Sequence, residues 1–232
     1  MTNPRPTRPA GLSPLAECCI RALADQGLGR ALSVGGAVGL MHYHEYRPTS
    51  DLDAWWDEDA DEGQRKRVLQ TARGALESAG TVSVRQWGEV ASVELSQEGR
   101  KVFSFQVASR SARLREPVQL PWAAVQLDSL EDLIASKMVA LVERGAPRDF
   151  RDIYELCREA LTDAPRAWHL WAERQRLSGS DPDHGRAALA LETHLSRLER
   201  HRPLAEIADP REKQRAGALR QWFREEFTHA GR

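Results

Sequence analysis

The spacing of apolar residues separates the chain into two stretches with different periods. Up to about residue 127, helical spacing alternates with short apolar runs, and the period changes to two between residues 81 and 108. Glu98-Gly99 supplies a turn inside that stretch, which favours a hairpin. The expected strands are 31–34, 51–56, 81–87, 89–95 and 101–108, with a further strand, interrupted by Pro121, at 118–127.

Helical spacing predicts a first helix that opens at Ser13-Pro14 and stops at Gly27. From Asp128 onward the pattern is helical to the end of the sequence. Asp128 and Glu131 fit a capping box, so we expect Asp128 to cap the helix that starts there. The other expected helices are 37–44, about 64–79, 149–160, 165–177, 184–199 and 210–227.

This order of elements predicts an α+β protein with a mixed sheet in its first half. We expect a flexible leader at 1–13, rich in Pro, Thr and Arg, an α+β domain at 14–127, and a helical C-terminal domain at 128–232.

Composition and charge narrow the class of protein. The 232 residues are 41% hydrophobic and 29% charged, which is globular composition, and the net charge of -1 excludes a globally basic nucleic-acid binder but not a local basic patch. The longest weakly polar run, 31–41, is too short to span a bilayer, and residues 1–10 lack the apolar stretch of a signal peptide. We therefore expect a soluble, cytoplasmic protein without a membrane partner.

Two acidic residues on one expected strand are the first candidates for chemistry. Asp51 and Asp53 are two residues apart, so their carboxylates point to the same face, where they repel unless a cation lies between them. Mg²⁺ (or Mn²⁺) is the natural cation, because it binds one or two carboxylates together with substrate phosphates. The alternative is an exposed strand edge with two solvated charges.

Gly35-Gly36 precedes the short helix that leads to these acids. Such a turn exposes backbone N–H groups that bind anions, although most glycine pairs are ordinary turns. A phosphate-binding turn joined to a metal-binding pair is what phosphoryl or nucleotidyl transfer needs. Thr49 and Ser50 fit turn residues, and Ser50 fits a phosphate contact equally well.

This segment resembles the signature of the DNA polymerase β-like nucleotidyltransferase superfamily, in which a Gly-Gly or Gly-Ser turn is followed by two spaced acids. Arg47, Thr49 and Ser50 just before the acids narrow the resemblance to the AbiEii/AbiGii toxin family. The resemblance implies a polymerase β-like nucleotidyltransferase head, with Arg47, Thr49 and Ser50 joining Gly35 and Gly36 at the nucleotide.

A second segment resembles the same family. It contains a helical Lys137, then Arg144, and then Arg148-Asp149 with Asp152 and a later leucine. The resemblance implies that Lys137 neutralises the phosphates and that Asp149 or Asp152 positions the groups or activates the acceptor hydroxyl. The alternative for Lys137 is a side chain whose ammonium group reaches water. The alternative for Asp149 and Asp152 is a structural salt bridge with Arg148, Arg151 or Lys137.

One position departs from the superfamily pattern, which usually includes a third carboxylate on a later strand. Gln106 stands at the expected place, and an amide supplies no charge. Glu94, Asp149 and Asp152 are possible substitutes.

The resemblance implies a metal-dependent transfer of NMP from an NTP, with tRNA or another nucleic acid as acceptor and a cognate antitoxin. A small-molecule nucleotidyltransferase and a catalytically silent nucleotide- or RNA-binding protein are the alternatives, the second favoured by Gln106. A tRNA acceptor needs a basic groove. The candidates for that groove are Arg144, Arg148, Arg151 and Arg158. We also predict that Lys137 and one of Asp149 and Asp152 face Asp51 and Asp53.

Overall fold

The computed structural model describes residues 4–230, which divide into two compact units between Leu133 and Ile134. The division falls inside helix α4 (Leu130–Glu143), a few residues after the boundary expected at residue 127. Within the expected leader, the backbone N–H groups of Ala10 and Gly11 donate to the Glu45 carboxylate (2.6 and 2.8 Å).

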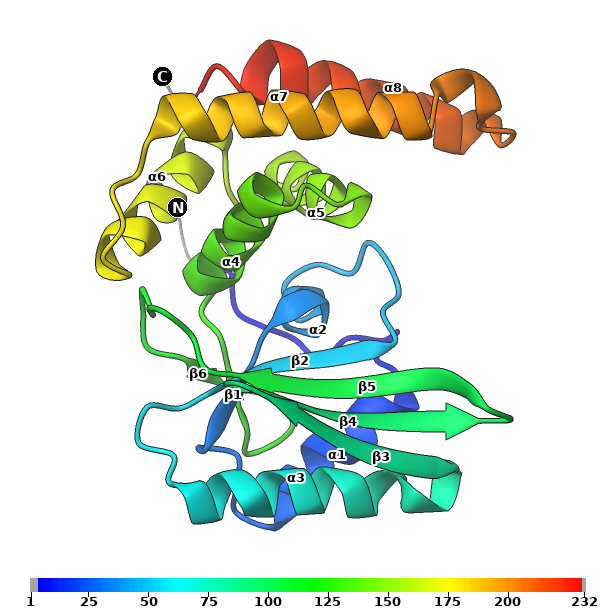
Figure 1. Cartoon of the computed structure of the whole chain (residues 1–232), viewed down its shortest axis with the longest axis vertical. Helices are drawn as coiled ribbons and strands as arrows, with labels where there is room; N and C mark the ends of the chain where they lie inside the picture. Colours follow the sequence, from blue (N-terminus) through cyan, green and yellow to red (C-terminus); the bar gives the residue numbers. More distant parts are fainter. Residues whose placement is uncertain (1–3, 231–232) are drawn as a thin grey trace. The chain divides into compact units, whose positions relative to one another are not determined.

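The first unit is built on a mixed seven-stranded sheet of order β3-β4-β5-β2-β1-β7-β6 (Figure 1). Strand β2 pairs antiparallel with β1 and parallel with β5, which places it at the centre. The strands are β1 (Leu32–Val34), β2 (Asp51–Trp56), β3 (Thr81–Trp87), β4 (Val90–Gln97), β5 (Arg100–Ala108), β6 (Val118–Gln119) and β7 (Gln126–Leu127).

Alternation along β2 divides the sheet into an apolar and a polar face. Leu52 and Ala54 are buried in a core that includes Phe105 of β5, whereas Asp51 and Asp53 point to the other face and remain partly exposed. Helices α1 (Pro14–Asp25) and α3 (Glu62–Leu76) cover the apolar face (Figure 1). The short helix α2 (Gly36–Met41) lies on the polar face.

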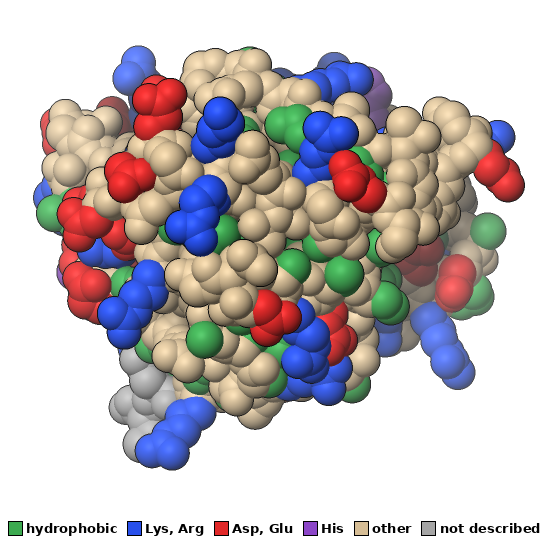
Figure 2. Space-filling model, turned by 90° about the horizontal axis from the view of Figure 1, so that it is seen from below, with side chains coloured by type: hydrophobic (Ala, Val, Ile, Leu, Met, Phe, Trp, Pro, Cys, Tyr) green, Lys and Arg blue, Asp and Glu red, His purple; other side chains and the backbone are tan. Residues whose placement is uncertain are grey.

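Figure 2 views the molecule from the side of α1 and α3. Basic and acidic side chains are interspersed on this surface, and neither sign of charge dominates it. Arg73 and Glu77, for example, form an ion pair at 2.9 Å near the end of α3. The surface therefore lacks the single-signed charge that a nucleic-acid backbone attracts.

The second unit is helical and has its own aromatic core. Trp168, Phe150 and Phe223 are fully buried, and Nε1 of Trp168 donates to the backbone oxygen of Phe227 (3.0 Å). Besides most of α4, the unit contains α5 (Pro147–Arg158), α6 (Ala164–Leu177), α7 (His184–His201), α8 (Pro210–Trp222) and a π-helical turn (Phe223–Phe227).

The α+β class, the mixed sheet and the helical second half predicted from the sequence are confirmed. Two local expectations are wrong. Residues 118–127 form two short antiparallel strands around Pro121 instead of one, and the capping box at Asp128 is displaced by one residue. Ser129 Oγ accepts a hydrogen bond from the Asp132 N–H (3.0 Å), because the Asp128 carboxylate is bound elsewhere. Within residues 4–230, none of the helices has the length and apolar character needed to cross a membrane.

Candidate functional site

The two acids of β2 are held by the neighbouring strand. Ser104 of β5 lies opposite Asp51 in the parallel ladder, and its hydroxyl donates to Asp51 Oδ1 (2.7 Å). Asp53 lies two residues further along the same face, beside Gln106. The β2–β5 pairing therefore fixes the direction of the Asp51 carboxylate and places both acids in one row, as the sequence predicts.

The Gly35-Gly36 turn lies against Asp53. The Gly35 N–H donates to the Asp53 backbone oxygen (2.9 Å), and Gly36 has a φ of +58°. A Cβ atom on Gly36 would overlap with Oδ2 of Asp53, so only glycine fits both the backbone conformation and the space. The first N–H groups of a helix have no acceptor within the helix. At the start of α2, these backbone donors therefore lie next to the Asp53 carboxylate, which is suited to a cation.

The position expected for a third acid is occupied by an amide. Gln106 lies next to Asp53 in the ladder, and Glu94 lies two strands away from Asp51, about 10 Å at the usual strand spacing. Glu94 also pairs with Arg85 at 3.6 Å. Among residues 4–230, no cluster of three or more Asp, Glu, His or Cys residues could hold a metal ion. At this part of the sheet, the described residues therefore offer a metal ion at most the two carboxylates of β2.

The residues before β2 form a partly exposed loop. Thr49 Oγ1 accepts a hydrogen bond from the Asp51 N–H (3.3 Å), which is the behaviour of a turn residue. The Arg47 guanidinium lies over the Tyr46 ring (5.8 Å), and Ser50 is exposed. Thr49 thus contacts β2 directly, through the backbone of Asp51.

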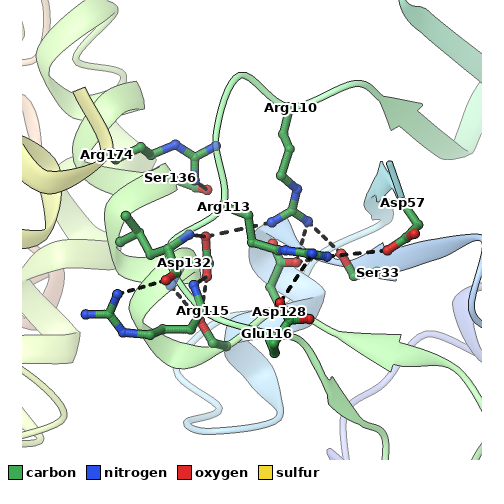
Figure 3. Close-up of polar contacts among 12 residues, drawn as sticks. Ser33, Asp57, Arg110, Arg113, Arg115, Glu116, Asp128, Asp132, Ser136 and Arg174 are labelled. Atoms are coloured by element: carbon green, nitrogen blue, oxygen red, sulfur yellow. Dashed lines mark hydrogen bonds and ion pairs between the residues drawn. The ribbon is translucent and has the colours of Figure 1, made fainter. Parts of the chain in front are cut away.

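A buried polar cluster at the other side of the Gly35-Gly36 turn was not expected from the sequence. Nη2 of Arg110, in the loop after β5, donates to both Ser33 Oγ and Asp128 Oδ1 at 2.6 Å, and Ser33 donates to the same Asp128 oxygen at 2.6 Å (Figure 3). The side chains of Arg110 and Asp128 are only 5% and 1% exposed. Burial raises the pKa of the Asp128 carboxyl, and the Arg110 charge opposes that rise. The only local sequence signal, the capping pattern at Asp128, pointed to a different role.

Asp132 attaches the loop after β5 to the start of α4. Its carboxylate accepts hydrogen bonds from the backbone N–H groups of Leu114 (2.8 Å) and Arg115 (2.9 Å), and it lies 3.8 Å from Arg110 Nη1 (Figure 3). Arg113 of the same loop turns instead to Asp57, at 3.4 Å. The contacts of Asp132 fix the loop around Arg110.

The predicted residues of the second unit form two ion pairs. Lys137 Nζ lies 2.7 Å from Asp152 Oδ2, with the Lys137 side chain 10% exposed and Asp152 fully buried. Arg144 donates twice to Asp149, at 2.8 Å each. The structure thus brings Lys137 and Asp152 together across the turn between α4 and α5, and gives Asp149 a separate partner. The approach of these groups to Asp51 and Asp53 stays a prediction.

Comparison with known proteins gives a family match over most of the chain. The sequence model of a family described as "Nucleotidyl transferase AbiEii toxin, Type IV TA system" matches residues 19–227. A search of curated proteins finds no match. Two similar solved structures are the antibiotic-resistance factor ANT(2'')-Ia (TM-score 0.45, 15% identity, covering 81% of this chain and 94% of that one) and a STING-associated CdnE c-di-GMP synthase from Capnocytophaga granulosa (TM-score 0.25, 9% identity, 95% and 83%). The family match spans both units of the chain.

Proposed function

Since the chain belongs to the AbiEii nucleotidyl transferase toxin family of type IV toxin–antitoxin systems, we propose that it moves a nucleoside monophosphate from an NTP to tRNA with the help of a divalent metal ion. The acceptor hydroxyl oxygen bonds to the α-phosphorus, pyrophosphate leaves, and the hydroxyl proton passes to a base. The observation that carries this proposal is the contact of the Gly35-Gly36 turn with Asp53 of the acidic pair on β2.

Asp51 and Asp53 fit a divalent ion. Their carboxylates lie in one row and stay partly exposed, and the missing Cβ of Gly36 leaves room for Asp53 Oδ2 beside the turn. Two carboxylates completed by phosphate oxygens and water suit Mg²⁺ or Mn²⁺. When bound, the ion supplies positive charge that offsets the charge of the transferred phosphoryl group. Ser104 keeps one Asp51 oxygen in a fixed direction for this task.

The triphosphate would lie on the turn beside these acids. The N–H groups that follow Gly35 and Gly36 can donate to phosphate oxygens. Ser50, which is exposed, adds a hydroxyl, and Arg47 adds a positive charge from the same loop. Thr49 serves this arrangement by holding the Asp51 backbone.

The helical unit would supply the remaining charges. A triphosphate carries more negative charge than one divalent ion offsets, which is the reason to assign Lys137 to it. Asp152 fixes the direction of the Lys137 ammonium at 2.7 Å. Asp152 or Asp149 would position the acceptor or take its proton.

For a tRNA acceptor, α5 and the turn before it carry the candidate phosphate contacts. Arg148 and Arg158 are exposed, Arg151 is partly exposed, and Arg144 binds Asp149. Arg158 also lies over the Tyr154 ring (5.8 Å), which offers an aromatic surface next to a cation.

Gln106 beside Asp53 favours one alternative, a protein that binds a nucleotide but does not transfer it. A single experiment separates the two functions. Each labelled NTP is incubated with the protein, Mg²⁺ or Mn²⁺, and total tRNA, and the products are separated on a gel. Label in the tRNA band supports the transferase. NTP binding without label in tRNA or in any smaller product supports the silent protein.

A further inference from the structure

Arg110, Asp128 and Ser33 enclose one side of the Gly35-Gly36 turn. Ser33 is two residues before Gly35 in the chain, and the Asp128 N–H donates to the backbone oxygen of Val34 (2.9 Å). Arg110 Nη2 reaches both side chains at 2.6 Å. The Arg110 guanidinium therefore links Ser33, in the strand that leads into the turn, with Asp128, which lies beside the turn (Figure 3).

Two buried polar atoms without a hydrogen-bond partner converge on Gly35. A Cβ built on Gly35 would lie 2.7 Å from Trp55 Nε1 and 3.3 Å from Asp128 Oδ2, and neither atom has a partner in the described structure. The Arg110 guanidinium also lies over the Trp55 ring, at 5.7 Å. Asp128 thus presents an unpaired carboxylate oxygen to the turn, while its other oxygen is bound to Arg110.

The Asp128 carboxylate beside the turn disfavours the binding of an anion there. Asp128 is 1% exposed, so water screens its charge poorly, and a nearby phosphate would be repelled unless a cation offsets the carboxylate. Arg110 is the cation that the structure pairs with Asp128. Its five donors also suit a fixed, buried contact better than a lysine ammonium does.

We propose that Arg110 is a positioning residue for the NTP: it neutralises the buried Asp128 carboxylate beside Gly35, so that this carboxylate does not repel the phosphates that the turn receives. Arg110 acts through Asp128 without touching the nucleotide. This inference rests on the proposed function, because it concerns the same triphosphate. It adds a residue to the site that the acidic motif and the helical motif do not contain.

The test measures nucleotide binding by calorimetry, with the four α,β-methylene nucleoside triphosphates and Mg²⁺, on the full chain. The variants are Arg110→Gln, Asp128→Asn and the double variant. Arg113→Gln is the control, because Arg113 lies in the same loop but contacts Asp57 and Glu116 instead. Arg110→Gln should weaken binding about tenfold or more, because like charges then face each other. The double variant, which has lost both charges, should bind within about threefold of the wild type, and so should Arg113→Gln.

A purely structural Arg110 gives a different pattern. The double variant would then bind as weakly as Arg110→Gln or more weakly, and this result overturns the proposal, as does unchanged binding by a folded Arg110→Gln. In tRNA labelling assays, Arg110→Gln should raise the KM for NTP more than it lowers kcat. Arg110→Lys, which keeps the charge but not the five fixed donors, should recover part of this rise in KM.

If Arg110→Gln does not fold, as judged by circular dichroism, NTP binding by Asp128→Asn tests the proposal instead. Removal of the carboxylate charge with Arg110 in place should leave NTP binding as tight as or tighter than in the wild type, and weaker binding overturns the proposal. If the wild type binds none of the four nucleotides, the proposed function fails and this inference fails with it. Wild-type binding with an unaffected Arg110→Gln variant overturns this inference alone.

Discussion

Single residues set the geometry of the candidate site through steric exclusion and buried polar contacts. Gly36 and Asp53 show the first effect, since the carboxylate occupies the space of the absent Cβ. Arg110 and Asp128 show the second, since they form an ion pair at 2.6 Å with both side chains almost completely buried. A substitution of Gly36 or Arg110 therefore alters the site without replacing a proposed metal ligand.

Gly36→Ala should lower transfer activity strongly and destabilise the fold by about 1–2 kcal/mol, because alanine at positive φ is strained and its Cβ displaces Asp53. Gly74→Ala is the matched control. Gly74 lies in α3 with open space around its Cβ position, so alanine there should stabilise the protein by about 0.5–1 kcal/mol. Urea unfolding and NMP transfer measure both variants. Full activity in Gly36→Ala would show that the turn does not restrict Asp53.

His42 should make stability depend on pH. Its Nδ1 contacts the Val38 oxygen (2.9 Å) and its Nε2 accepts from Trp122 Nε1 (3.2 Å), so the buried ring is neutral. Burial lowers the pKa of His42 below its ordinary value of 6.5. As pH falls below about 6.5, the unfolded chain binds a proton that the folded chain does not, so the free energy of unfolding decreases.

His42→Gln removes this titration and leaves partners unsatisfied, at a cost of about 1–3 kcal/mol at pH 7.5. Urea unfolding at pH 7.5 and pH 5.5 checks the prediction, and the gap between wild type and variant should narrow at the lower pH. A gap that widens on acidification would contradict a neutral buried His42.

At the scale of elements, local patterns predicted most of the strands and helices, while contacts distant in sequence decided the rest. The alternation of Asp51 and Asp53 with Leu52 and Ala54 gives β2 the bounds that were predicted, because one face is buried and the other is not. Asp128 shows the opposite case. Its capping signal is local, but Arg110, 18 residues earlier, binds the carboxylate and leaves the cap to Ser129.

The candidate site follows the same division. The Gly35-Gly36 turn and the two acids were predictable, because short-range spacing places them. The partners of Lys137, Asp149 and Asp152 were left open, since several Arg and Lys side chains lie within reach along α4 and α5. The network of Arg110 had no sequence signal at all, because it joins β1, the loop after β5 and the start of α4.

The Lys137–Asp152 pair should stabilise the helical unit. Lys137→Met leaves the fully buried Asp152 without its ion-pair partner and should lower the free energy of unfolding by about 3–5 kcal/mol. Lys137→Met combined with Asp152→Leu should cost less than Lys137→Met alone. Arg158→Met is the control, since Arg158 is half exposed and pairs loosely with Glu155, and it should cost less than about 1 kcal/mol. Equal losses for the Lys137 and Arg158 variants would show that the buried pair adds no stability.

At the scale of the whole molecule, the match to the toxin family runs through both units. The prediction that depends on both units together is an arrest of growth. Expression of the wild type without an antitoxin should arrest growth, and Asp53→Ala should relieve the arrest if transfer causes it. Growth curves and colony counts after induction, with equal protein levels checked by blotting, measure this. Harmless expression of the wild type in several hosts would count against a toxin.

The role of the acidic pair is tested most directly by measuring NMP transfer by Asp51→Asn and Asp53→Asn, with Asp59→Asn as the control. Asp59 is exposed in the loop after β2, so its loss removes the same charge close by without touching the site. If Asp51 and Asp53 hold the metal ion, both β2 variants should fold, as judged by circular dichroism, and lose label transfer from NTP, while Asp59→Asn keeps wild-type transfer. Full NTP turnover by either β2 variant would contradict the assignment of the acidic pair.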